Sequence, residues 1–98
     1  MATLHTVNKS PFERTSLQRC MDFALPGCAI LLLEDGVYAA RTGSDYAQQL
    51  KSLADVRVFV LGPDAQARGV SVDATIGVVD YVGFVELAVE FSKVQSWL

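Results

Sequence analysis

Several residue patterns that mark common classes of enzyme are missing from this chain. Neither G-x-G-x-x-G nor G-x-x-x-x-G-K-[ST] occurs, so the backbone cradles of dinucleotide-binding and P-loop proteins are absent. The serine nucleophile turn G-x-S-x-G is also absent. One histidine, His5, and two cysteines, Cys20 and Cys28, without C-x-x-C spacing are too few for a closed zinc site. We therefore expect no bound metal and no cofactor.

The chain also has no surplus of positive charge and no long apolar run. Eight Lys and Arg against eleven Asp and Glu give a net charge of −3, which predicts no direct binding of nucleic acid. The longest apolar run is too short to span a membrane. Residues Met1–Lys9 lack the apolar segment of a secretory signal. We expect a cytoplasmic protein whose thiols are reduced.

The most informative segment that is present runs from Ile30 to Val37. Four consecutive aliphatic residues, Ile30–Leu33, predict a strand buried on both faces, as in a parallel sheet covered by helices. The strand stops at Glu34, Asp35 and Gly36, and the carboxyl ends of such strands are where ligands bind in open α/β sheets. Asp35 is therefore a candidate ligand-binding residue, although a carboxylate before glycine also commonly just forms a turn.

Strands and helices alternate along the 98 residues, which we expect to form a single domain, 1–98. Right-handed βαβ units predict a three-layer α/β fold with a mostly parallel sheet of four to five strands, helices on both faces and a flavodoxin- or Rossmann-like topology. We expect strands at Ala2–Val7, Cys28–Leu33, Val56–Leu61 and Ile76–Val79. We expect helices at Ser10–Leu25, Asp45–Leu53 and Tyr81–Ser92, short helical turns at Val37–Arg41 and Pro63–Arg68, and a tail at Lys93–Leu98. Ser10, Ser44 and Asp80 are the expected N-caps.

The last expected helix is apolar around nearly its whole circumference. Hydrophobic residues make up 51% of the chain, a large share for so small a domain. A helix that is apolar on more than one side is buried on more than one side, and here the second side is expected to meet another subunit. An unusually wide contact with the domain's own core is the alternative. The expected interface residues are Phe84, Leu87, Phe91, Trp97 and Leu98.

The two cysteines are expected to be buried packing residues. Cys28 begins a buried strand, and Cys20 lies too far along the first helix to be activated by the helix dipole. A reactive Cys20 is the alternative. His5, in the first strand, is expected to be a hydrogen-bonded structural residue rather than a base.

Five blocks of sequence, in order along the whole chain, closely resemble the DsrH/TusB family. These blocks are Leu4–Phe12, Leu33–Ala40, Ala67–Gly69, Val79–Val85 and Gln95–Leu98. The resemblance implies a small α/β subunit of a cytoplasmic heterohexamer that relays persulfide sulfur. The implied partners are a DsrE/TusD-like and a DsrF/TusC-like sister subunit. In the Tus branch of this family the sulfur goes to 2-thiouridine at the tRNA wobble position, and in the Dsr branch the relay serves sulfur oxidation.

The resemblance also implies which subunit carries the sulfur. The sulfur-carrying sister subunit has a nucleophilic cysteine before the segment that matches Arg68-Gly69, whereas this chain has Val60–Asp64 there, with Leu61 and no thiol. The chain thus resembles the non-catalytic partner, with a mainly structural role in assembly. Cys20 resembles a first-helix cysteine of Dsr-type members, so we expect the Dsr branch, with tRNA thiolation as the other branch. Two alternatives stay open: Cys20 carries a persulfide directly, or the chain is a homo-oligomer that binds a small ligand near Asp35.

Overall fold

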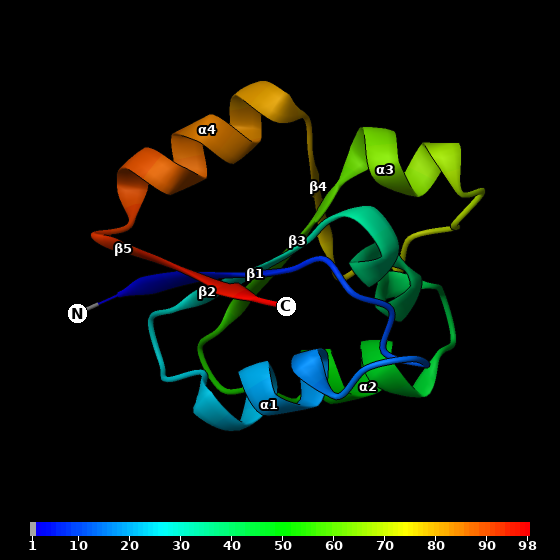
Figure 1. Ribbon diagram of the computed structural model, residues 1–98, viewed down its shortest axis with the longest axis horizontal. Helices are drawn as coiled ribbons and strands as arrows, with labels where there is room; N and C mark the ends of the chain where they lie inside the picture. Colours follow the sequence, from blue (N-terminus) through cyan, green and yellow to red (C-terminus); the bar gives the residue numbers. More distant parts are fainter. Residues whose placement is uncertain (1) are drawn as a thin grey trace.

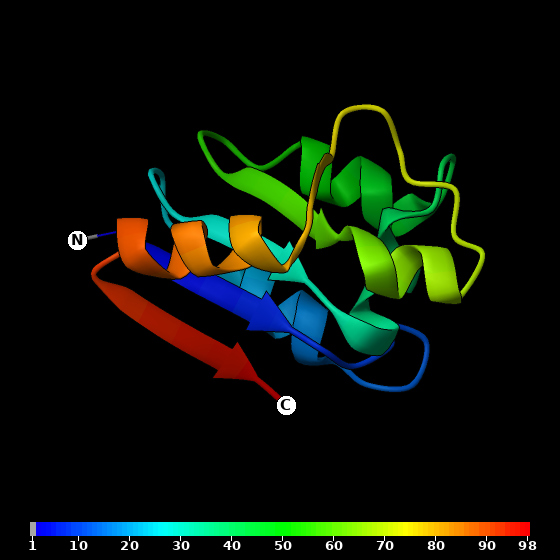
Figure 2. The same ribbon diagram turned by 90° about the horizontal axis from the view of Figure 1, so that it is seen from above.

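The computed structural model describes residues 2–98, and its centre is a five-stranded, entirely parallel sheet. The spatial order is β4-β3-β2-β1-β5 (Figures 1 and 2). The strands are β1 Thr3–Val7, β2 Ala29–Leu32, β3 Arg57–Leu61, β4 Gly77–Val79 and β5 Lys93–Trp97.

Helices cover both faces of this sheet. The helices α1 (Ser16–Phe23) and α2 (Asp45–Lys51) lie on one face, and α4 (Tyr81–Glu90) lies on the other (Figure 1). A 3-10 helix, η1 (Glu34–Ala40), and the short helix α3 (Gly62–Ala67) begin where β2 and β3 end. The predicted α/β fold with a parallel sheet between two helical layers is confirmed.

The direction of the chain explains which face each helix covers. The chain moves outward from β1 to β4 one strand at a time, then returns across the sheet to place β5 beside β1. Because parallel crossovers are right-handed, a reversal of direction moves the connecting helix to the opposite face. This is why α4 lies on the face opposite α1 and α2 (Figure 1).

The core has two layers, because successive strand residues point to opposite faces. Val7, Ile30 and Leu32 pack against α1 and α2, and we call this side the α1/α2 face. Leu4 and Leu31 pack against α4 on the other side, the α4 face. Leu31, Leu32 and their neighbours in β2 are fully buried, as predicted from the aliphatic run.

The first helix is shorter than the prediction. Residues Ser10–Arg14 form a separate turn in which the backbone N–H groups of Glu13 and Arg14 both donate to the carbonyl of Ser10. The carbonyl of Pro11 would accept from Thr15 in a continuous helix, but here it accepts from the hydroxyl of Tyr46 at 3.2 Å. A tertiary contact therefore replaces the first helical turn, and α1 begins at Ser16.

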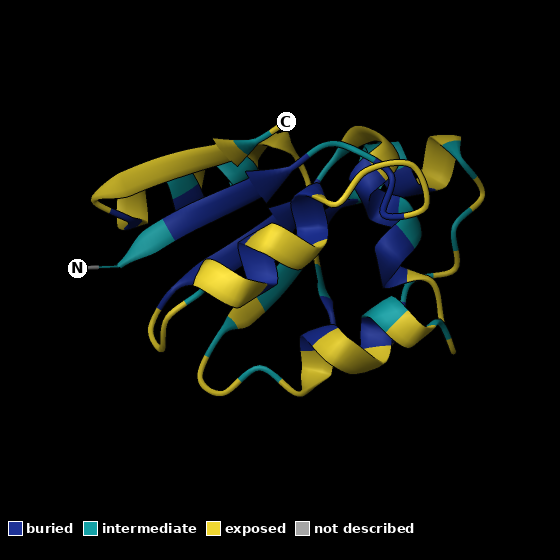
Figure 3. Cartoon of the chain, turned by 60° about the horizontal axis from the view of Figure 1, so that its bottom comes forward, coloured by how far each residue is buried: buried dark blue, intermediate teal, exposed yellow. Residues whose placement is uncertain are grey.

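The predicted tail, Lys93–Leu98, is also wrong, because Lys93–Trp97 forms β5. All five residues of β5 pair in register with β1, from Thr3 opposite Lys93 to Val7 opposite Trp97. This edge strand is exposed over most of its length (yellow in Figure 3), so its sequence lacks the apolar alternation by which strands are recognised. The other strands and the helices α2 and α4 lie where they were predicted, with shorter bounds, whereas η1 begins three residues before the expected turn at Val37–Arg41 and α3 begins one residue before the expected turn at Pro63–Arg68. Ser44 and Asp80 are the caps expected, accepting from Ala47 N at 3.0 Å and Gly83 N at 2.8 Å.

Candidate functional site

The carboxyl end of β3 is the position at which the resemblance places a thiol in a sister subunit. Here β3 ends at Leu61, and Gly62 begins α3 directly. The side chain of Leu61 is buried, with 2% of its surface exposed. An apolar side chain that points into the core can neither accept nor release sulfur, so this end of the sheet has no nucleophile at that position.

Asp35, the candidate ligand-binding residue, lies at the same edge of the sheet but is engaged within the protein. Its Oδ1 accepts from Nε of Arg68 at 2.9 Å, and Arg68 also donates to the carbonyl of Asp64 at 3.3 Å. The hydrogen bond to Asp35 raises the pKa of Arg68. The ion pair joins the start of η1 to the end of α3, which is a structural role for both side chains.

The turn that carries Asp35 is held tightly. Glu34 has a φ of 49°, in the left-handed region that residues other than glycine rarely adopt. Its backbone N–H donates to the carboxylate of Asp64 at 2.6 Å, which stabilises that conformation. The next glycine, Gly36, packs against β1 so closely that an added Cβ would lie 2.2 Å from the carbonyl oxygen of Val7. The Glu34–Gly36 turn therefore needs glycine at its third position.

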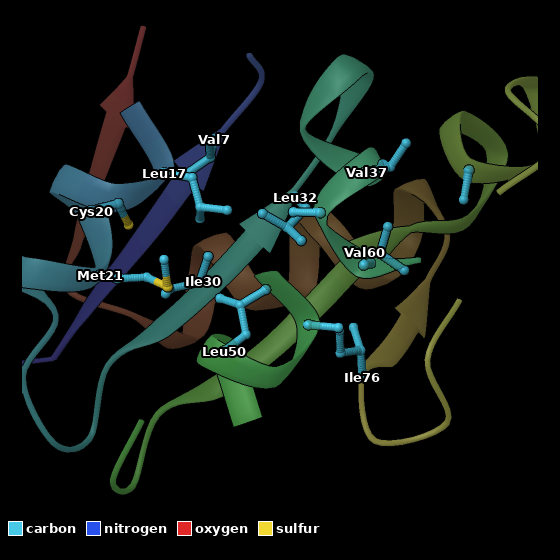
Figure 4. Close-up of a cluster of buried hydrophobic side chains, with 14 residues drawn as sticks. Val7, Leu17, Cys20, Met21, Ile30, Leu32, Val37, Leu50, Val60 and Ile76 are labelled. Carbon is cyan, nitrogen blue, oxygen red and sulfur yellow. The ribbon is translucent and has the colours of Figure 1, made fainter. Parts of the chain in front are cut away.

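Neither cysteine has the surroundings of a reactive thiol. Cys20 is fully buried among the side chains between α1 and the sheet (Figure 4), and Cys28 is 3% exposed. Burial, followed by the proximity of Cys28, raises the pKa of Cys20 to about 12. The nucleophile is the thiolate, so burial and the raised pKa both disfavour the reactive form of Cys20.

The helix α4 has two apolar sides, as its composition indicated. Leu87 is buried and Phe84 is half-buried against the α4 face of the sheet. On the side away from the sheet, four apolar side chains lie between 59% and 80% exposed. We call this set the α4 stripe: Tyr81, Val82, Val85 and Val89.

The structure distributes the five expected interface residues differently from the prediction. Leu87 and Phe91 lie in the core beneath α4, and Phe84 packs against that core. Trp97 is half-buried in β5 beside β1, and Leu98 is 77% exposed. The subunit interface itself stays a prediction, but the apolar surface that α4 offers to a partner belongs to the α4 stripe. Once Leu87 and Phe91 are assigned to the core, helical spacing alone separates the residues that face the sheet from the α4 stripe.

His5 is the structural histidine that was expected, and its partner is Trp97. Trp97 Nε1 donates to His5 Nδ1 at 3.0 Å, so Nδ1 carries no proton and the ring proton lies on Nε2. Burial lowers the pKa of His5, which favours this neutral form. This contact could not be predicted, because Trp97 was expected in a tail.

Residues 2–98 contain neither a possible metal site nor a membrane-spanning helix. No three His, Cys, Asp or Glu residues of this part of the chain gather into a possible metal site. No helix within it is long and apolar enough to cross a membrane.

The fold and these features define a small, parallel α/β protein with an unpartnered apolar helix face and no nucleophile at the end of β3. A family model described as "DsrH like protein" matches residues 9–94. The chain belongs to this DsrH family, which confirms the resemblance seen in its sequence and makes it a member of a family of sulfur-relay subunits.

Curated relatives agree with this family along almost their whole length. The chain is 38% identical over 98 residues to Protein TusB of Pectobacterium parmentieri, with 96% of this chain and 99% of the relative covered. It is 35% identical over 96 residues to Protein TusB of Escherichia coli O1:K1 / APEC, with the same coverage. The crystal structure of ychN protein from E. coli shares the fold, with a TM-score of 0.79 over 99% of this chain and 100% of that chain, at 17% identity.

Proposed function

We propose that this chain is a non-catalytic subunit of a cytoplasmic sulfur-relay complex. The observation that carries the proposal is the family match over residues 9–94, together with a buried leucine at the end of β3. A subunit without a thiol at that position contributes by assembly, holding the sulfur-carrying loop of a sister subunit in place.

The α4 stripe is the surface we assign to that assembly. Its members Tyr81, Val85 and Val89 recur every four residues and therefore share one side of the helix. A contiguous exposed apolar surface of this kind marks a protein interface more often than it does solvent-facing structure. The proposed partners are a DsrE/TusD-like and a DsrF/TusC-like subunit, in a heterohexamer with two copies of each chain.

For the final acceptor we propose the wobble uridine of tRNA. The relatives at 35–38% identity are named Protein TusB, which supports the Tus branch over the Dsr branch that Cys20 favoured. The test is expression of this chain in an E. coli strain that lacks its own TusB, with 2-thiouridine in bulk tRNA measured by mass spectrometry. Restored 2-thiouridine is the expected result. Stable co-purification with both sister subunits without restored 2-thiouridine would exclude this acceptor and leave the assembly role intact.

Sulfur oxidation of the Dsr type is the second candidate, and Cys20 is the observation that favours it. A direct carrier role for Cys20 requires a thiol that reagents can reach. Because Cys20 is buried and its pKa is raised to about 12, we expect iodoacetamide at neutral pH to label it only after unfolding. Labelling of Cys20 in the folded chain at the rate of a free thiol would instead contradict its assignment as a buried packing residue and favour the carrier role.

The third possibility, a homo-oligomer that binds a small ligand at Asp35, has less support. The carboxylate of Asp35 is already paired with Arg68, and its loss would break the link between η1 and α3. Stable homodimers that bind neither sister subunit in a mixing experiment would favour this possibility over assembly with the sister subunits.

A further inference from the structure

A hollow lies on the α1/α2 face, above the two strands β1 and β5. Residues Thr3 and His5 of β1 are in register with Lys93 and Gln95 of β5, so their side chains share this face of the sheet. The helix α1 lies over β1 and β2 on this side, and β5 runs along its flank without a helix of its own (Figure 3). The result is a cavity of about 260 Å³ beside the end of α1.

Aromatic rings form one wall of this cavity. The ring of Phe23, the last residue of α1, is 67% exposed, and its centroid lies 5.6 Å from that of Trp97. The centroid of the His5 ring lies 6.1 Å from that of Trp97. A planar group that enters the cavity would therefore meet apolar ring surface.

None of the polar side chains that line the cavity carries a negative charge. Trp97 occupies Nδ1 of His5, so the imidazole offers its Nε2–H, which has no acceptor among residues 2–98. The ammonium group of Lys93 forms no ion pair in the described part of the chain, and no carboxylate lines the cavity. Gln95 adds an amide that either donates or accepts.

We propose that this cavity binds a small planar anion, an aromatic ring that carries one carboxylate. The ring would lie against Phe23 and Trp97, and the carboxylate would accept from Lys93 and from Nε2 of His5. The volume is below the roughly 300 Å³ at which pockets for drug-sized molecules begin, which limits the ligand to about one ring with its substituent. This site is separate from the α4 stripe, which lies on the opposite face of the sheet.

Trp97 reports on binding directly, because it is the single tryptophan of the chain. The experiment titrates the full chain with benzoate and follows tryptophan fluorescence. Benzamide, a neutral molecule of nearly the same shape, and inorganic phosphate, an anion without a ring, are titrated in parallel. We expect a saturable response to millimolar benzoate, a response to benzamide about fivefold weaker, and none to phosphate.

Three variants assign the two parts of the ligand to their residues. Lys93→Gln is expected to weaken benzoate binding about fivefold, the equivalent of one exposed ion pair. Arg19→Gln removes the same charge from the exposed surface of α1 and is expected to leave binding unchanged. Phe23→Leu keeps an apolar side chain without the ring and is expected to weaken both benzoate and benzamide. No saturable response to benzoate, equal binding of benzamide, or equal behaviour of Lys93→Gln and Arg19→Gln would overturn the proposal.

Discussion

The helices α1 and α4 cover opposite faces of the same sheet, yet their outer surfaces differ completely. The outer side of α1 carries Gln18, Arg19 and Asp22, and Gln18 donates to Asp22 at 3.2 Å across one helical turn. The outer side of α4 carries the α4 stripe, with Val89 80% exposed. Both helices bury an apolar side against the sheet, so core packing cannot account for the difference. Only α4 carries a second apolar stripe along its length, and the side chains of that stripe stay exposed in the folded chain.

The buried side of α1 should dominate folding. Leu17 is 1% exposed in the cluster between α1 and the sheet, so Leu17→Ala is expected to lower the free energy of unfolding by about 2–5 kcal/mol. The matched change on the α4 stripe, Val85→Ala, is expected to alter it by less than about 0.5 kcal/mol, because the side chain is 61% exposed. Urea denaturation of the isolated chain measures both. Similar losses for the two variants would mean that Val85 packs within the chain.

The outer side of α4 should dominate assembly. Val89→Asp is expected to weaken binding to sister subunits by about 2 kcal/mol, because a charge would replace an apolar contact in the interface. Gln18→Asp on the outer side of α1 is the matched control and is expected to bind normally. Co-purification and sedimentation with co-expressed sister subunits give the measurement. Normal assembly of Val89→Asp would remove the α4 stripe from the interface.

The amino ends of the two helices differ as well. Asp80 caps α4 by accepting from Gly83 N at 2.8 Å, whereas Thr15 makes no side-chain hydrogen bond at the start of α1. Asp80→Ala is therefore expected to lower the free energy of unfolding by about 1 kcal/mol. Thr15→Ala is expected to lower it by clearly less. Thermal denaturation of both variants makes the comparison. An equal loss of stability in the two variants would show that the side-chain cap of α4 adds nothing to the free energy of unfolding.

The smallest expected effect is a pH dependence of the free energy of unfolding, caused by His5 on the α1/α2 face. Burial lowers the pKa of His5 below its ordinary value of 6.5, so the unfolded chain takes up a proton at a higher pH than the folded chain. The free energy of unfolding should therefore fall as the pH drops through 6.5, and the fall should end below the folded pKa. Since His5 is the single histidine, His5→Gln should remove this slope. A slope that persists in the variant would assign it to another group.

The parts of the fold that could be predicted are those in which one segment contains the whole signal. The run Ile30–Leu33 is aliphatic at every position, and the burial of its first three residues on both faces of the sheet followed from that pattern alone. The caps Ser44 and Asp80 lie directly before apolar, helix-forming segments, and local chemistry sufficed to place them. For the candidate interface, the helix that carries it could be predicted, but the individual residues could not. The excess of apolar residues in α4 was visible, but which of them face the sheet depends on how the helix is seated.

The parts that could not be predicted depend on contacts between distant segments. Ser10–Arg14 has the residues of a helix start, but the hydroxyl of Tyr46 takes the carbonyl that the first turn needs. Likewise Asp35 could be placed at the end of a strand, whereas its pairing with Arg68 depends on the positions of η1 and α3.

The sequence by itself determined the alternating α/β order, the buried central strand, the missing thiol at Leu61 and the family, because these depend on residue types and their local spacing. Only the tertiary structure decided that Lys93–Trp97 is a strand, that Trp97 bonds to His5, and that the free surface of α4 consists of Tyr81, Val82, Val85 and Val89. The physical reason is that an edge strand, a hydrogen bond across 92 positions and the rotation of a helix on a sheet are all set by partners far away in the chain.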